Sequence, residues 1–243
     1  MVSVMPRQIV AMGGAGMLRP PAGTPSLFEY AVAQQMNSTP AVGFLHQASA
    51  ESAEYVDFFV RNCREIGAEP TVFSLFGRVD IEAIRTQILA QDVIFVGGGN
   101  LKSMLALWRE WGVDQYLREA YDQGCVMAGV SAGAICWYEQ CVSDAFGPLS
   151  VVEGLGWVKG SLCPHFDSEP ERRPTTLALR ETDALENGWA LDDYTAIHVI
   201  NERDVSAISS QRGRFVYRVD EGGVTRQPTA PVAERLGVRT TRS

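Results

Sequence analysis

The sequence lacks several features that would point to particular classes of protein. No apolar run approaches the roughly 20 residues that a membrane-spanning helix needs, so we expect no membrane partner. The 21 basic residues are outnumbered by 29 acidic ones, and the formal net charge of −8 would repel a phosphate backbone. We therefore expect a soluble globular protein that does not bind nucleic acid.

The five cysteines form an odd set without a CxxC pair, and the N-terminus has no basic region followed by an apolar run and a cleavage site. This pattern favours a protein of the reducing cytoplasm. Cys136 and Cys141 are expected to share a helix, and they lack the short spacing of a zinc site. We expect buried free thiols and no bound metal.

The first half of the chain alternates short β-branched runs with amphipathic stretches. Strands are expected at residues 8–12, 41–45, 71–75, 93–96 and 125–128, and helices at 26–36, 50–66, 80–89 and 114–121. Asp80 is a candidate cap for the third helix. Strands and helices that alternate at this pitch predict a parallel sheet with helices on both faces.

The second half changes character after a predicted helix at residues 174–185. Strands are expected at 196–200, 205–208 and 215–219, with 211–214 as a hairpin turn. These strands would add an antiparallel edge to the parallel sheet. The chain has 243 residues, of which 46% are apolar, which is enough for one sizeable core. We therefore predict one α/β domain over residues 1–228 and a flexible polar tail over 229–243.

The run GVSAG at residues 129–133 matches the nucleophile-elbow pattern G-x-S-x-G. A predicted strand precedes it and a predicted helix over 132–138 follows, which is the order that such an elbow requires. Ser131 is therefore a candidate nucleophile, and the amide of Ala132 could stabilise an oxyanion. The alternative is an ordinary glycine-rich turn.

A second glycine-rich loop, GGGN at residues 97–100, follows the strand expected at 93–96, at an edge where α/β sheets place their sites. Its exposed amides could supply another oxyanion donor. Neither this loop nor the glycine turn at 13–16 matches a dinucleotide or phosphate-binding motif. We therefore expect no nucleotide cofactor, and a structural role for the turn at 13–16.

Only three histidines can serve as a base. His165 lies in a loop-like segment and ranks first, His198 lies inside a β-branched strand pattern, and His46 has no supporting motif. The carboxylate that would orient the imidazole stays open from the residues alone, and the candidates are Asp144, Asp167 and Glu202.

Three segments together, FVGGGN at 95–100, GVSAGA at 129–134 and PHF at 164–166, closely resemble peptidase family S51. The resemblance extends from the first strand to about Ser210. It implies a three-layer sandwich around a largely parallel sheet and peptide hydrolysis by a serine triad without metal or cofactor.

Carried over by motif, the resemblance makes Ser131 the nucleophile and His165 the general base, with the amides of Gly99 and Ala132 as the oxyanion hole. The orienting acid falls on Glu202, with Asp144 as the alternative.

The resemblance also implies a small peptide substrate, in the best-known cases an aspartyl dipeptide. Arg173 is the candidate cation for an acidic side chain, although the loop before it is shorter than in the family, and Asn100 is a second candidate substrate contact. A broader dipeptidase or esterase, and a non-catalytic binding member of the family, are the alternatives. The sequence leaves both a monomer and a homo-oligomer open.

Overall fold

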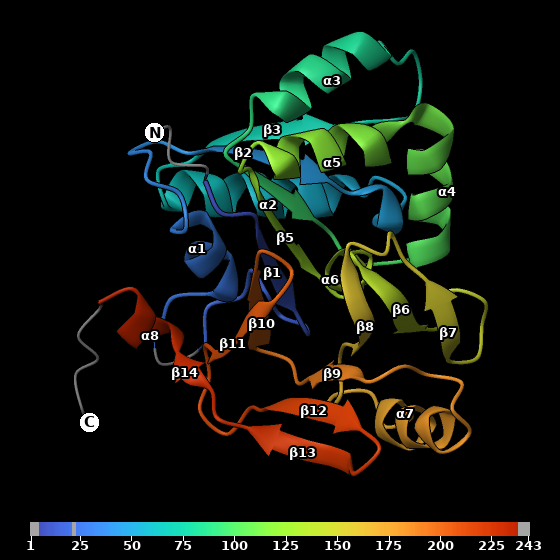
Figure 1. The fold of residues 1–243 in the computed structure, drawn as a ribbon. Helices are drawn as coiled ribbons and strands as arrows, with labels where there is room; N and C mark the ends of the chain where they lie inside the picture. Colours follow the sequence, from blue (N-terminus) through green and yellow to red (C-terminus); the bar gives the residue numbers. More distant parts are fainter. Residues whose placement is uncertain (1–4, 21–22, 238–243) are drawn as a thin grey trace.

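The computed structural model describes residues 5–20 and 23–237. Two sheets organise these residues (Figure 1). The first sheet has eight strands, in the order β14 (Ala230–Pro231), β11 (Asp204–Ser209), β10 (Thr195–Ile200), β1 (Gln8–Met12), β5 (Val126–Val130), β4 (Val93–Val96), β2 (Ala41–Leu45) and β3 (Glu69–Phe73). The strands expected at 8–12, 41–45 and 93–96 are confirmed to the residue.

Five neighbouring strands of this sheet, β1, β5, β4, β2 and β3, run parallel to one another. Strand β10 runs antiparallel to β1, so that Gln8 faces Ile200 and Met12 faces Ala196. The start of β10 therefore lies beside the carboxyl end of β1, and the end of β10 lies at the opposite edge of the sheet. This direction decides which loops can meet at a site.

Helices cover both faces of the first sheet. On one face lie α1 (Leu27–Val32) and α2 (Ala53–Glu65), and on the other lie α3 (Ile81–Leu89), α4 (Leu101–Trp111) and α5 (Val113–Asp122). Within β4, Val93 and Phe95 pack toward the first pair of helices, while Ile94 and Val96 pack toward the second group. The predicted three-layer α/β fold is confirmed, and the side chain of Asp80 caps α3 as expected.

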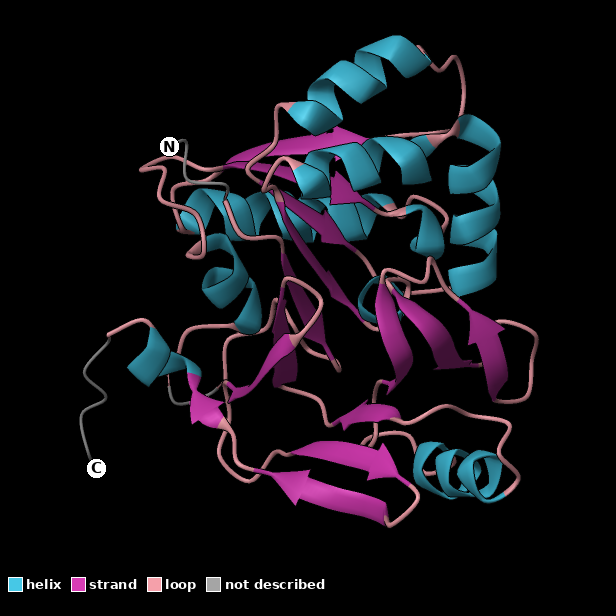
Figure 2. Cartoon of the chain, viewed as in Figure 1, coloured by secondary structure: helices cyan, strands magenta, loops and turns pink. Residues whose placement is uncertain are grey.

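The second sheet was not foreseen from the sequence. Its order is β13 (Gly223–Gln227), β12 (Val216–Asp220), β9 (Gly188–Leu191), β8 (Val158–Cys163), β6 (Tyr138–Ser143) and β7 (Ser150–Glu153). Helix α7 (Arg172–Glu181) lies beside it, at the end of the molecule away from α3 (Figure 2). Leu179 of α7 packs with Tyr217 and Val219 of β12 in a small core of its own.

Two expectations fail here for the same reason. The helix expected over 132–138 is the single turn α6 (Ala132–Ile135), and Cys141 lies in β6 instead of sharing a helix with Cys136. Residues 211–214 do not form a hairpin turn, because β11 pairs in the first sheet and β12 in the second. Strand pairing beyond the local segment decided both structures.

The C-terminal region also differs from the expected flexible tail over 229–243. Strand β14 pairs with Ile208 and Ser209 of β11, and the short helix α8 (Val232–Arg235) follows it. Val232 and Ala233 are almost completely buried, because α8 packs against α1. Burial of these two apolar side chains holds the segment on the domain. Residues 238–243 of the expected tail lie outside the described residues.

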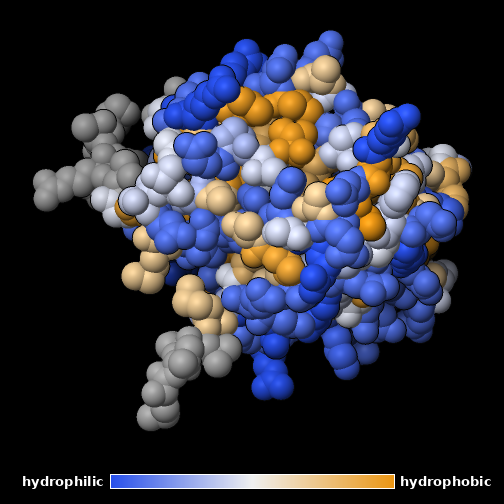
Figure 3. Space-filling model, turned by 90° about the horizontal axis from the view of Figure 1, so that it is seen from above, coloured by the Kyte–Doolittle hydropathy of each residue, from blue (hydrophilic) through white to orange (hydrophobic). Residues whose placement is uncertain are grey.

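The surface is mixed in character. On the face in Figure 3, hydrophobic residues form separate patches among hydrophilic ones. None of the helices in the described part of the chain combines the length and apolar character needed to cross a membrane.

All five cysteines are free and buried, as predicted. Burial raises the pKa of the Cys63 thiol to about 12 and that of Cys163 to about 11. These thiols therefore stay protonated and unreactive near neutral pH.

Candidate active site

Ser131 lies on a sharp turn between β5 and α6. Its backbone has φ 56° and ψ −117°, a strained combination for a residue with a side chain. The turn requires glycine on both sides of Ser131, because a side chain there would clash with the backbone. A Cβ on Gly129 would lie 2.2 Å from the carbonyl oxygen of Gly133, and one on Gly133 would lie 2.1 Å from that of Val96. Ser131 is partly exposed between two buried neighbours, which is the geometry of a nucleophile elbow.

The GGGN loop packs directly against this serine. A Cβ placed on Gly98 would lie 3.2 Å from the Cβ of Ser131 and 3.7 Å from its Oγ. The amide of Gly98 already donates to the Tyr55 hydroxyl, at 3.3 Å. In residues 5–20 and 23–237, the amides of Gly99 and Ala132 donate to no acceptor. The two amides expected to form the oxyanion hole are therefore not already bonded within the described part of the protein.

His165 follows β8 and has a left-handed backbone, with φ 53°. Its Nδ1 lies 2.8 Å from Oδ1 of Asp193, and both side chains keep about a fifth of their surface exposed. A carboxylate oxygen can only accept, so Nδ1 carries the proton and donates it. In the neutral imidazole this leaves Nε2 as a free acceptor, the state a general base requires.

Asp193 lies in the segment that leads from β9 of the second sheet into β10 of the first. Burial raises the pKa of this carboxyl, but the hydrogen bond from His165 and the charge of His165 outweigh burial and lower it below its ordinary value. Asp193 is therefore ionised near neutral pH and can stabilise an imidazolium beside it.

The end of β1 and the turn after it connect the segments that carry Ser131, His165 and Asp193. The consecutive carbonyls of Met12, Gly13 and Gly14 accept hydrogen bonds from the amides of Ser131, His165 and Tyr194, at 3.1, 3.3 and 3.0 Å. A Cβ on Gly14 would lie 1.8 Å from Oδ1 of Asp193 and 2.6 Å from Nδ1 of His165. The glycine turn at 13–16, for which a structural role was expected, is thus in direct contact with the site.

The structure does not bring Glu202 to His165. Glu202 follows β10, and because β10 runs antiparallel to β1 it lies at the edge of the sheet away from Ser131. Its carboxylate accepts two hydrogen bonds from the guanidinium of Arg7, at 2.8 and 2.7 Å. The expected acid is therefore engaged in an ion pair elsewhere.

The alternative acid, Asp144, forms no hydrogen bond or ion pair with the imidazole in the described part of the chain. It is in the turn after β6, its side chain is 65% exposed, and its nearest cation is Arg172 at 4.0 Å. Asp167, the third candidate, uses Oδ1 to accept the backbone amide of Asp193 at 2.8 Å. The carboxylate that meets His165, Asp193, was missed because the sequence does not reveal the direction of β10. An acidic pair just before a β-branched strand was the available signal.

Both residues expected to bind substrate have partners within the protein. The guanidinium of Arg173 lies over the rings of Phe166 and Tyr217, 4.9 and 5.1 Å from their centroids. The side chain of Asn100 caps α4 by accepting from the amide of Ser103, and it donates to the carbonyl of Ala145.

The other two histidines lie outside this arrangement. His198 is buried in β10, where Nε2 donates to Gln8 and Nδ1 accepts from the Tyr30 hydroxyl, as expected for a structural histidine. His46 is buried, and its ring stacks on Phe44. Burial lowers the pKa of both imidazoles. Within the described ranges, no group of three or more His, Cys, Asp or Glu residues could hold a metal ion.

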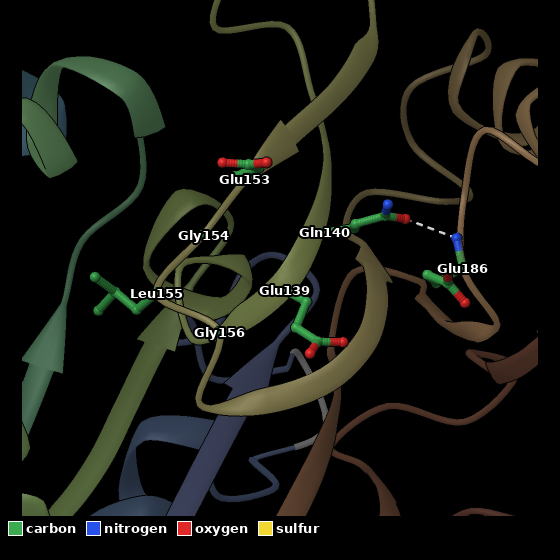
Figure 4. Close-up of a pocket in the computed structure, with 7 residues that line it drawn as sticks. All are labelled: Glu139, Gln140, Glu153, Gly154, Leu155, Gly156 and Glu186. Carbon is green, nitrogen blue, oxygen red and sulfur yellow. Dashed lines mark hydrogen bonds between the residues drawn. The ribbon is translucent and has the colours of Figure 1, made fainter.

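A separate cavity of about 400 Å³ lies in the second sheet (Figure 4). Its lining includes Glu139 and Gln140 of β6, Glu153 of β7 and Glu186, whose amide donates to Gln140. These residues lie near the starts of β6 and β9, whereas His165 follows the end of β8. The cavity contains none of the residues grouped around Ser131.

Two solved structures share the fold. A putative peptidase E protein from Listeria monocytogenes EGD-e aligns with a TM-score of 0.63 at 19% identity, over 84% of this chain and 98% of that one. A peptidase from an acI-B1 Actinobacterium aligns with a TM-score of 0.68 at 17% identity, over 93% of this chain and 96% of that one.

Sequence comparison shows the family as well as the fold. The chain is 41% identical over 213 residues to the uncharacterized peptidase YgaJ of Bacillus subtilis (strain 168), covering 88% of this chain and 92% of that protein. The model of peptidase family S51 matches residues 9–206, which include Ser131, His165 and Asp193. The chain therefore belongs to peptidase family S51 and is an enzyme of the peptidase class.

Proposed function

We propose that the chain hydrolyses short peptides through a triad of Ser131, His165 and Asp193. The observation that carries this proposal is the 2.8 Å hydrogen bond from His165 to Asp193. The neighbouring carbonyls of Met12 and Gly13 accept the amides of Ser131 and His165, which links the serine to this pair. The bond leaves Nε2 of His165 free to act on a hydroxyl. The strained elbow supports Ser131 as the group that carries that hydroxyl.

In the first step, Nε2 of His165 takes the proton of Ser131 as its Oγ bonds to the peptide carbonyl carbon. The carbonyl oxygen gains the negative charge, and the amides of Gly99 and Ala132 are the proposed donors to it. Asp193 stabilises the imidazolium. The imidazolium then gives its proton to the departing amine as the C–N bond breaks, which leaves an acyl-enzyme on Ser131.

In the second step, water attacks the acyl carbon while Nε2 of His165 takes a proton from that water. The ester bond to Ser131 breaks, the serine oxygen recovers its proton from His165, and a carboxylic acid product leaves. Every proton in this sequence moves between Ser131, His165, water and the substrate. The chemistry needs no group beyond the side chains and amides named.

Substrate choice is proposed to be broader than peptides with an N-terminal aspartate. The residue expected to select that side chain, Arg173, is stacked on two aromatic rings, and the buried carboxylate of Asp192 is among the charges near it. Asn100 is likewise engaged in the cap of α4. These contacts support a scaffold role for both side chains. A cation held in this way offers less of its charge to a substrate.

Covalent labelling with a fluorophosphonate tests the nucleophile without knowledge of the natural substrate. The wild-type chain should be labelled, Ser131→Ala should not be labelled, and His165→Ala should be labelled several orders of magnitude more slowly. Circular dichroism of each variant confirms that it has folded. Labelling that persists in Ser131→Ala would contradict the assignment.

A library of dipeptides tests the substrate class. We expect hydrolysis of dipeptides with neutral N-terminal residues as well as Asp, and similar preferences in Arg173→Ala and the wild type. Strict dependence on N-terminal Asp that disappears in Arg173→Ala would instead assign Arg173 as the selector. Failure of the wild type to cleave any peptide in a library extended to tri- and tetrapeptides would contradict the proposed reaction.

A further inference from the structure

Asp193 has a second contact that the triad does not explain. Its backbone amide donates to Oδ1 of Asp167, at 2.8 Å. The other carboxylate oxygen of Asp167 forms an ion pair with the guanidinium of Arg214. The side chains of Asp167 and Arg214 are 19% and 35% exposed, so this ion pair is partly shielded from solvent.

These contacts form a closed ring of His165, Asp167 and Asp193. Asp167 follows His165 by two residues in the same loop, so the chain itself links the two side chains. The carboxylate of Asp193 accepts from His165, and the amide of Asp193 donates to Asp167. Asp193 is thus held at two points, its side chain and its backbone, by one short segment.

Arg214 joins this ring from a third part of the chain. It lies in residues 211–214, where the chain crosses from β11 of the first sheet toward β12 of the second. Asp193 lies in the crossing from β9 to β10, in the opposite direction. The ion pair therefore links two crossings between the sheets through the loop that carries His165.

A carboxylate can accept the Asp193 amide in many orientations when its other oxygen is free. The guanidinium of Arg214 removes much of that freedom, because it binds the second oxygen of Asp167. With the Asp167 carboxylate fixed, the amide of Asp193 has one acceptor position, and its side chain has a narrower range of approach to Nδ1 of His165. Small displacements matter here, since a shift of about 1 Å in an oriented group can reduce turnover by about 100-fold.

We propose that Asp167 and Arg214 are positioning residues, which fix the backbone of Asp193 so that its carboxylate stays hydrogen-bonded to Nδ1 of His165. This inference rests on the proposed function and adds two residues to it. Neither residue touches the reacting atoms. Their effect passes through Asp193 alone.

The first measurement is the rate of labelling by a fluorophosphonate in the full chain. Asp167→Ala and Arg214→Gln should each slow labelling by about 10- to 100-fold. Asp167→Asn, which keeps an oxygen for the Asp193 amide, and Arg214→Lys, which keeps the charge, should recover part of the rate. The double variant of Asp167→Ala and Arg214→Gln should be no slower than Asp167→Ala, because both changes act on one contact.

The second measurement is the proton NMR signal of the His165 Nδ1–H. The chain has three histidines, so variants of His46 and His198 identify this signal. In the wild type, the hydrogen bond to Asp193 should place the signal far downfield and slow its exchange with water. In Asp167→Ala and Arg214→Gln, the signal should move upfield or broaden as exchange becomes faster.

Arg85→Gln is the matched control, because it also breaks an arginine–carboxylate ion pair, with Glu119 at 2.9 Å, between helices α3 and α5. It should leave both the labelling rate and the Nδ1–H signal unchanged. A purely structural role for Asp167 and Arg214 would lower the melting temperature without moving either readout.

The positioning proposal is overturned if Asp167→Ala and Arg214→Gln keep the wild-type Nδ1–H signal, whether or not labelling slows. Failure of the proposed function looks different, because labelling would then be absent in the wild type or persist in Ser131→Ala. The NMR signal still decides the positioning role in that case. If Asp167→Ala does not fold, Arg214→Gln with its Arg214→Lys rescue decides it.

Discussion

The two ends of β10 have similar chemistry and different surroundings. Just before the strand, Asp193 accepts a hydrogen bond from an imidazole that has a free nitrogen. Just after it, Glu202 accepts two hydrogen bonds from the Arg7 guanidinium. Left-handed backbone occurs at both ends, at Tyr194 with φ 63° and at Glu202 with φ 57°. A carboxylate at or beside a left-handed residue occurs at both ends, so these features do not show which acid meets the imidazole.

Strand direction distinguishes them. Since β10 runs antiparallel to β1, its start lies at the edge where β5 presents Ser131 and its end lies at the far edge. Six strand residues at roughly 3.4 Å each separate the two carboxylates by about 20 Å. A loop's position relative to the sheet, and not its composition, decides whether its acid can orient a base.

The largest expected effect is at the start of β10. Asp193→Asn should reduce turnover by about 10⁴-fold, because an amide in place of the carboxylate no longer fixes the tautomer or stabilises the imidazolium. Peptide hydrolysis and fluorophosphonate labelling measure the loss. Glu202→Gln is the matched control at the other end, and it should retain wild-type turnover. Equal losses in both variants would contradict the comparison.

The middle of β10 gives a pH-dependent effect on stability. Burial, with a contribution from the charge of Arg235, lowers the pKa of His198 to about 4. Because the unfolded chain binds a proton near pH 6.5 and the folded chain does not, stability should fall as the pH drops from 6.5 toward 4. The loss attributable to His198 is at most about 3 kcal/mol.

Urea unfolding of the wild type and His198→Gln at pH 7 and pH 4.5 tests this effect. A glutamine can keep contacts to Tyr30 and Gln8 but does not titrate, so the variant should lose less stability on acidification. The acid-induced losses of the other groups cancel in the difference. Identical pH dependence in the two proteins would rule His198 out as the titrating group.

A methyl group at the turn beside Asp193 should affect activity more than stability. Gly14→Ala places a Cβ on the contact between Asp193 and His165, so one of the two side chains must move. We expect a fall in turnover of about 100-fold. Gly222→Ala, in the exposed β12–β13 turn, is the control, because only the Asp220 carboxylate lies near its Cβ. Normal turnover in Gly14→Ala would show that the contact tolerates displacement.

The smallest effect is expected for the stability of Glu202→Gln. The pair with Arg7 is partly exposed, so its loss should cost about 1 kcal/mol at pH 7. Burial raises the pKa of Glu202, but the hydrogen bonds and charge of Arg7 outweigh burial and lower it. The contribution of the pair is thus present at neutral pH and disappears as the pH falls below about 4. Urea unfolding at pH 7 and pH 3.5 should show the variant and wild type converging.

The sequence alone predicted much of the first sheet and part of the candidate site. The burial of β1, β2 and β4 along almost their whole length follows from their apolar runs, and Ser131 and His165 stand in motifs with a local physical meaning. The second sheet was missed because β6 begins at Tyr138, two residues after Cys136, within a stretch whose local pattern favours a helix. Local preference was overruled there by pairing with β7 and β8.

The acid of the site was beyond sequence reasoning for a related reason. Whether a carboxylate before or after β10 meets His165 depends on the antiparallel pairing of β10 with β1, more than 180 residues away in sequence. Residue type and position alone favoured Arg173 and Asn100 as substrate contacts. Their partners, Phe166, Tyr217 and Ser103, became visible only in three dimensions.

The three carbonyls of residues 12–14 have a consequence for synthesis of the chain. They lie near the N-terminus, whereas their partners Ser131, His165 and Tyr194 follow over the next 180 residues. A growing chain on the ribosome contains these three carbonyls early, but it cannot complete their hydrogen bonds until Tyr194 has emerged. Hydrolytic capacity should therefore appear only in the last part of translation.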